Sequence, residues 1–89
     1  MARKTPRKIG YPVEVTWCDA TSRTEWHTLD EHRASPPMVV KSSGYLTRND
    51  SRVVQIVQSW RAPEPDEPQL VADSLTIPRG WVRRVRRLR

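Results

Sequence analysis

The chain of 89 residues has no phenylalanine, one cysteine, three glycines and no long apolar run. One cysteine cannot form a disulfide within the chain, which is typical of a reducing compartment. The three glycines are too scattered for a glycine-rich phosphate loop, which argues against nucleotide hydrolysis. No apolar stretch approaches the roughly 20 residues of a membrane-spanning helix or resembles a secretory leader. We therefore expect a cytoplasmic location and no membrane contact.

Basic residues are concentrated at the two ends of the chain. Residues 1–10 and 79–89 together hold ten of the sixteen lysines and arginines and no acidic residue. Residues 11–78 hold the other six basic residues and all ten acidic ones. The net charge of +6 is therefore the sum of +10 at the ends and −4 in the body. This distribution predicts one localised anion-binding surface.

Apolar residues make up only 36% of the chain, so the core must be small. A domain of this size buries only about 60–65% of the surface that its unfolded chain exposes, and self-association is a common remedy. We therefore expect a homo-oligomer. In a chain without phenylalanine, we expect the four tryptophans (17, 26, 60 and 81) to supply the bulk of the core.

The N-terminal part of the chain divides into an arm and the start of a domain. Residues 1–10 have no apolar periodicity, which predicts a flexible basic arm followed by a single domain over residues 11–89. In residues 11–19 apolar and polar side chains alternate, as in a strand with one buried face.

A short helix is predicted over residues 29–34. Thr28 and Glu31 have the spacing of a capping box, in which each side chain satisfies a free backbone N–H of the other residue. Ser22 and Glu25 have the same spacing but are less well placed.

Four further segments have strand composition: residues 38–47, 52–60, 71–77 and 81–88. Residues 48–51 have the composition of a hairpin turn, and Gly44 predicts a bulge or a sharp bend. Residues 61–70 form an acidic, proline-rich loop that cannot supply a central strand. Four to five short antiparallel strands and one helix predict a mainly β fold, a small SH3-like or Sm-like barrel.

The C-terminal segment alternates arginines with apolar anchors. Val82, Val85 and Leu88 recur every three residues, which suits a bulged strand that points several arginines to one side. Arginine offers a planar fork for phosphate, and tryptophan can stack on a base. The predicted ligand-binding residues are Arg79, Gly80, Trp81, Arg83, Arg84, Arg86 and Arg87. Two alternatives are a solvated terminal strand and pairing with the acidic loop of the same or a neighbouring subunit.

Catalysis and metal binding have less support. Cys18, His27 and Asp30 could serve as nucleophile, base and orienting acid, but nothing in the sequence activates the thiol. Cys18, His27 and His32 are soft metal ligands, yet a five-residue step puts the two histidines on opposed faces of an ideal helix. We therefore predict no enzyme activity, no metal and no cofactor.

A set of motifs resembles a group of small bacteriophage proteins without an assigned activity. The motifs comprise Val15, Trp17 and Asp19; Trp26; Ser43, Gly44, Tyr45 and Leu46; Val54, Ile56, Gln58 and Ser59; and Ile77, Pro78, Arg79 and Gly80, followed by Val82, Val85 and Leu88. The resemblance covers most of residues 13–88. It implies a viral origin and action in the host cytoplasm.

A second resemblance is to Sm-like and SH3-like barrels. Gly44, Leu46 and Asp50 are similar to the glycine, leucine and acidic turn residue of Sm-like proteins. The Arg-Gly turn of that family lies at an RNA-binding pore, which by position nominates Arg79 and Gly80. The chain differs from the family at Pro78 and in having no asparagine after Asp50. The resemblance implies a curved small barrel.

Together these observations predict a non-enzymatic, phage-encoded binding protein. Its ligand would carry phosphate, either as nucleic acid or as a nucleotide signal of host defence that the protein sequesters. The alternative is an inhibitor or adaptor that docks on a host or viral protein through arginine and tryptophan anchors.

Overall fold

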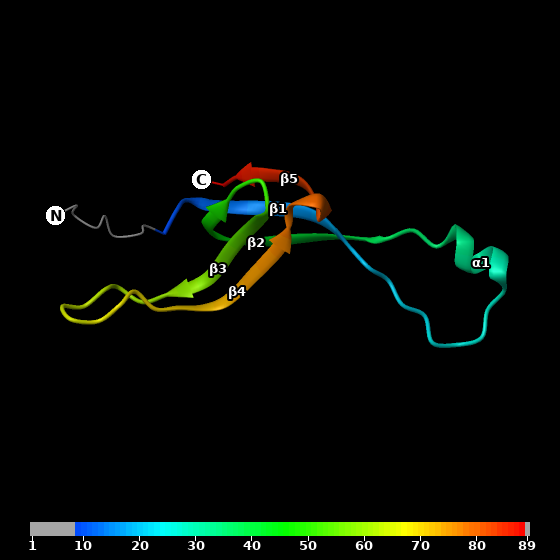
Figure 1. The fold of residues 1–89 in the computed structure, drawn as a ribbon, viewed down its shortest axis with the longest axis horizontal. Coiled ribbons are helices and arrows are strands. Elements are labelled where there is room, and N and C mark those ends of the chain that lie inside the picture. The colour runs from blue at the N-terminus through cyan, green and yellow to red at the C-terminus, as the bar shows by residue number, and fades with distance from the viewer. Residues whose placement is uncertain (1–8, 89) are drawn as a thin grey trace.

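The computed structural model describes residues 9–88, which form five strands and one α-helix (Figure 1). The elements are β1 (Pro12–Asp19), α1 (Leu29–Ala34), β2 (Met38–Asn49), β3 (Val53–Trp60), β4 (Val71–Pro78), the 3-10 turn η1 (Arg79–Trp81) and β5 (Val82–Arg87). The prediction of a mainly β protein with one short helix is confirmed. Among the described residues, no helix has the length and apolar character needed to cross a membrane.

All five strands belong to one antiparallel sheet with the order β4-β3-β2-β1-β5. β4 and β5 are its edges, and within residues 9–88 no ladder of hydrogen bonds joins them, so the sheet is open. The part of the prediction that specified a closed SH3-like or Sm-like barrel is therefore not confirmed. β4 ends at Pro78, which has no N–H to donate, and the chain then passes through η1 to the opposite edge.

The strand β2 changes its pairing partner at Tyr45. It pairs with β1 up to this residue and with β3 beyond it. At the adjacent Gly44, a Cβ atom would stand 2.8 Å from the carbonyl oxygen of Val57 and 3.2 Å from the Cβ of Ile56. Only a residue without a side chain lets β3 approach this closely. The pairing with β1 is regular at Gly44, and the register shift of β2 lies further on, between Leu46 and Arg48.

The core consists of aliphatic side chains from the central strands, and the prediction that tryptophans supply its bulk is wrong. The buried cluster comprises Val13, Val15, Val54, Ile56 and Ile77. Trp17 packs against it half-buried, whereas Trp60 and Trp81 are 46% and 45% exposed and Trp26 is fully exposed. The narrow inner face is filled by β-branched residues. The other three tryptophans lie at a strand end, in a connection and in η1, where little covers them.

Two long connections extend from the sheet at opposite ends of the molecule (Figure 1). Residues 20–37, between β1 and β2, carry α1 and are called the arm below. Residues 61–70, between β3 and β4, are called the acidic loop. The radius of gyration is 17.8 Å, whereas a compact chain of this length has one of about 12 Å. Since α1 buries none of its residues, the arm stands free of the sheet.

The helix begins where the capping box predicts it. Thr28 is the N-cap, and its hydroxyl accepts a hydrogen bond of 3.1 Å from the backbone N–H of Glu31. No helix forms at Ser22 and Glu25, the less well placed pair.

Most of the predicted basic arm, residues 1–8, and Arg89 lie outside the described residues. Ile9 and Gly10, the last two residues of that predicted segment, are described. The backbone N–H of Gly10 donates to the carbonyl of Leu46 at 2.8 Å, so the chain already follows β2 at this point.

Candidate functional site

The residues predicted to bind a ligand do not gather in one place. Arg79, Gly80 and Trp81 form η1, and Arg87 lies over the ring of Tyr11 with 4.2 Å between its guanidinium carbon and the ring centroid. The remaining three share one face of β5: Arg83, Arg84 and Arg86. The predicted ligand-binding residues therefore lie in three places: in the turn η1, on one face of β5, and, for Arg87, in a cation–π pair with Tyr11.

Arg79 ties η1 to the hairpin between β2 and β3. Its backbone N–H donates to the carbonyl of Arg52 at 2.9 Å, and its Nη1 donates to the Oδ1 of Asn49 at 2.6 Å. This guanidinium is already engaged in holding two turns together. Gly80 lies in open space, since a Cβ there would meet nothing within 4 Å.

The hairpin itself is organised by Asp50. Its carboxylate accepts hydrogen bonds from the backbone N–H groups of Arg52 at 2.8 Å and Val53 at 3.0 Å, and it pairs with the guanidinium of Arg48. The hydrogen bond from Arg48, followed by those two backbone bonds, lowers the pKa of Asp50 from 3.8 to about 2. The carboxylate is thus ionised throughout the neutral range.

Trp81 stacks on Trp17 at the end of the core. The ring centroids are 6.3 Å apart with only 8° between the planes, and Nε1 of Trp17 donates to the hydroxyl of Ser42 at 3.0 Å. The sequence left open whether Trp81 is core or surface. It is 45% exposed, and the stack fixes its orientation.

A β-bulge places Arg83 and Arg84 side by side. Arg84 lies opposite Thr16 of β1, and Val82 lies opposite the next residue, Trp17, so Arg83 is the extra residue of β5. Val82 and Val85 pack against the core while the arginines between them are exposed. The predicted bulged strand is confirmed, and the bulge explains the three-residue step from Val82 to Val85. Leu88, the third predicted anchor, is not among the residues that pack against the core cluster.

The register of three strands extends this basic surface. Thr16 lies opposite Arg84 of β5 on one side and Lys41 of β2 on the other. Side chains opposite one another on neighbouring strands have Cβ atoms about 4.5–5.5 Å apart. The row lies on the outer face of the sheet, because Thr16 follows the buried Val15. Lys41, Arg83, Arg84 and Arg86 are called the basic face below.

One acid lies within the basic face. Glu14 of β1 lies opposite Arg86 and accepts a hydrogen bond from its guanidinium at 3.3 Å. Within residues 9–88, no ion pair engages Lys41, Arg83 or Arg84. Three cations thus lie together without a neutralising carboxylate, an arrangement that favours an anion.

No protein-family model matches the chain, and comparisons with curated proteins and with solved structures found no match.

Lys41 and Thr16 were missed by the sequence analysis. Alternation alone puts both on the polar side of their strands, since each lies between residues that point inward. Their position beside Arg84 depends on the pairing register of β2, β1 and β5, which alternation does not specify.

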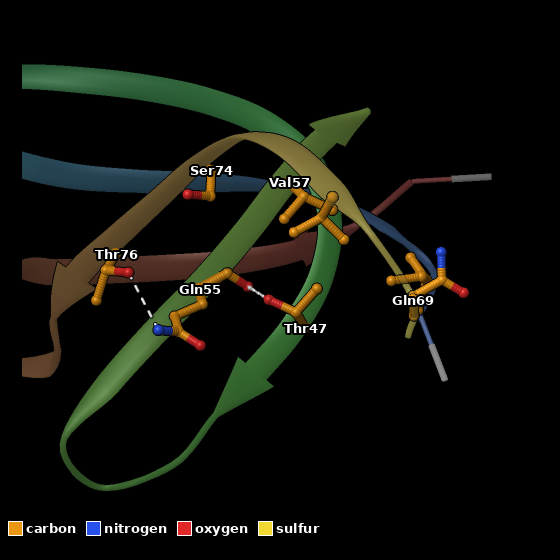
Figure 2. Close-up of a pocket in the computed structure, with 8 residues that line it drawn as sticks. Thr47, Gln55, Val57, Gln69, Ser74 and Thr76 are labelled. Carbon is orange, nitrogen blue, oxygen red and sulfur yellow. Dashed lines mark hydrogen bonds between the residues drawn. The ribbon is translucent and has the colours of Figure 1, made fainter. Parts of the chain in front are cut away.

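A pocket of about 400 Å³ lies elsewhere, against β3 and β4, and it is electrically neutral (Figure 2). Its polar lining includes Gln55, whose Nε2 donates to the hydroxyl of Thr76 at 3.1 Å and whose carbonyl accepts from Thr47 at 3.2 Å. None of the predicted ligand-binding residues lines it. A phosphate would find no cation there.

The catalytic and metal sets considered from the sequence are not assembled. Cys18 lies on β1, whereas His27 and Asp30 lie in the arm, and Nδ1 of His27 bonds to the carbonyl of Glu25 at 2.8 Å. Within the part of the chain that the structure describes, no group of three or more histidine, cysteine, aspartate or glutamate residues could hold a metal ion.

Proposed function

We propose that this protein is a non-enzymatic nucleic-acid-binding protein and that its basic face contacts the phosphate backbone. The observation that carries the proposal is the row of Arg84, Thr16 and Lys41 across three strands, with Arg83 beside it on the bulge. Arginine forks bind phosphate oxygens in pairs, and a lysine adds a mobile positive charge.

An extended polyanion suits this surface better than a small nucleotide. The basic face is one side of a sheet, and four pockets of about 390 to 700 Å³ in the described part of the chain are lined by other residues. Small ligands bind in concave sites that bury most of their surface. A nucleotide signal of host defence therefore remains the alternative phosphate-bearing ligand, and it would require a concave site formed between copies.

The finer classification is also part of the proposal. The sheet would be an open variant of the SH3-like and Sm-like barrels that the sequence resembles, and the protein a phage product acting in the host cytoplasm. Supporting features are the antiparallel order of the strands, the close approach of β3 to β2 at Gly44, and a single turn, η1, that joins the two edges.

The test is the salt dependence of DNA binding. Binding of the full chain to a labelled duplex should weaken linearly on a log–log plot against salt, because each neutralised phosphate adds about 0.9 to the slope. Arg83→Ala with Arg84→Ala should reduce the slope by about 1–2 units. The matched control is Arg33→Ala with Arg61→Ala, which removes the same charge from the arm and the acidic loop. Equal slopes for the two double variants would contradict the proposal.

A second candidate function is protein docking through the arm, the alternative considered from the sequence. It is favoured by Trp26, which is fully exposed, and by Leu29 of α1, which is 59% exposed. Exposed aromatic anchors of this kind are typical of interaction surfaces. The first partner to test is a second copy of the chain, because Trp60, Leu70 and Val71 form an exposed apolar pocket at the other end of the molecule. Absence of DNA binding at low salt together with such docking would favour this candidate.

A further inference from the structure

The arm is a small lobe with its own hydrogen bonds. At its base, the hydroxyl of Thr21 donates to the carbonyl of Pro36 at 3.3 Å. Further out, the guanidinium of Arg23 binds the carboxylates of Glu25 at 2.6 Å and Glu31 at 3.2 Å. These contacts hold the segment before α1 against the helix.

Within this lobe the two histidines of the chain come together. The spacing of five residues argues against such a pair only if both residues belong to one helix. Because α1 begins at Leu29 with Thr28 as its N-cap, His27 precedes the helix and the argument does not apply. The rings of His27 and His32 have centroids 6.0 Å apart with 51° between their planes.

A hydrogen bond selects the ring nitrogen of His27 that can act as a ligand. Its Nδ1 lies 2.8 Å from the carbonyl oxygen of Glu25. A carbonyl oxygen can only accept, so Nδ1 carries the hydrogen, and in the neutral ring Nε2 keeps its lone pair. Metal-binding histidines are commonly oriented by this kind of bond from the other ring nitrogen.

The surroundings of the two rings also suit a cation. Both histidines and Met38 line a surface pocket of about 700 Å³, which has room for an ion and its water. Arg23 is the one arginine in its lining, and it is bound by two carboxylates, so this cluster has a net negative charge.

We propose that His27 and His32 bind one divalent transition-metal ion, of the group Zn²⁺, Ni²⁺ and Cu²⁺, with water in the remaining positions. Two imidazole ligands at tetrahedral angles and bond lengths of about 2.0–2.1 Å have ring centroids about 5 Å apart. The observed separation is 6.0 Å, so a rotation of the exposed His32 is enough to close the site. Imidazole nitrogen selects these metals over Mg²⁺ and Ca²⁺, which prefer oxygen.

The consequence for the fold is local. A bound ion would join the residue before the N-cap to the last turn of a helix that buries none of its residues. Short isolated helices are marginal in water, so this link would order the lobe that presents Trp26.

The experiment is calorimetric titration of the full, tag-free chain with Zn²⁺ and with Ni²⁺, and with Mg²⁺ as the negative control, all without nucleic acid. We expect one Zn²⁺ or Ni²⁺ ion per chain and no heat from Mg²⁺. His27→Ala and His32→Ala should each lower the association constant about tenfold or more. Cys18→Ser should bind as tightly as the parent chain, which excludes coordination by the thiol.

Imidazole signals in the NMR spectrum give a second readout, because the chain has only two histidines. Addition of Zn²⁺ should shift both sets of ring signals together. The proposal is overturned if Zn²⁺ produces no heat, shifts only one ring, or binds equally to the chain that lacks both histidines. Since α1 buries nothing, both variants should keep the unfolding midpoint of the parent.

Discussion

At the scale of the residue, identical side chains of the C-terminal segment have different roles. Arg79 holds η1 to the hairpin, Arg86 pairs with Glu14, and Arg87 covers Tyr11. Within residues 9–88, Arg83 and Arg84 alone among these make no side-chain hydrogen bond, ion pair or cation–π contact. The free arginines are therefore the ones to test first for ligand binding.

Gly44 is the residue at which β3 approaches β2 too closely for a side chain. We expect Gly44→Ala to destabilise the protein by about 1–3 kcal/mol, because the new methyl group would overlap backbone that cannot move freely. The overlap would be with the carbonyl oxygen of Val57, 2.8 Å from the Cβ position. Chemical denaturation measures the difference in the free energy of unfolding, with one m-value fitted to both proteins.

The control for this substitution is Gly80→Ala in η1. Its Cβ would meet nothing within 4 Å, so we expect a change within about 0.5 kcal/mol. If both alanine variants were equally stable, the close approach of β3 at Gly44 would not constrain the fold.

At the scale of the element, the hairpin between β2 and β3 is held by one carboxylate with three donors. Asp50 accepts from Arg48 and from the N–H groups of Arg52 and Val53. Because η1 is bound to the same hairpin through Asn49, the turn positions the start of β5. The ionisation of Asp50 therefore affects the position of the basic face as well as the stability of the turn.

The stabilisation from Asp50 should depend on pH. Its pKa is lowered from 3.8 to about 2 in the folded chain, so the contribution is complete above pH 3.8 and is lost as the pH falls toward 2. We expect Asp50→Asn to be less stable than the parent at neutral pH, with the difference shrinking across that window. Thermal unfolding midpoints measured through the acid range test this. The control is Asp66→Asn in the acidic loop. The difference between its unfolding midpoint and that of the parent should stay the same across this pH range.

At the scale of the whole molecule, two apolar surfaces lie at opposite ends. The arm exposes Trp26 and Leu29, and the region where the acidic loop meets the sheet exposes Trp60, Leu70 and Val71. These last three line a pocket of about 390 Å³. The two regions are separated along the length of one chain (Figure 1), so only a second copy can bring them together. The resulting contact would be heterologous, from head to tail.

We therefore expect the chain to self-associate, and light scattering at micromolar concentration should give a mass above that of the monomer. Trp26→Ala removes the arm's anchor and Trp60→Ala removes part of the receiving pocket, so each variant alone should be monomeric. Mixed together they should form a dimer, since one intact arm can still enter one intact pocket. A monomeric parent chain, or a mixture that stays monomeric, would contradict head-to-tail contact.

The strand and helix positions could be predicted because they rest on short-range chemistry. Alternation specified β1, the Thr28 cap specified α1, and the spacing of Val82 and Val85 specified the bulge in β5. The placement of the tryptophans could not be predicted in this way. The size of a tryptophan ring makes its burial favourable. Whether another part of the chain covers the ring depends on how far the sheet closes.

What the sequence by itself determined is the order of the elements, the turn at Asp50 and the surplus of positive charge at the C-terminus. Each of these depends on residues only a few positions apart. The tertiary structure alone decided that the sheet stays open, that Lys41 joins Arg83 and Arg84, and that His27 meets His32. The first two follow from the pairing register of distant strands, and the third from the point where α1 begins. Such arrangements depend on contacts between whole elements, which local sequence patterns do not specify.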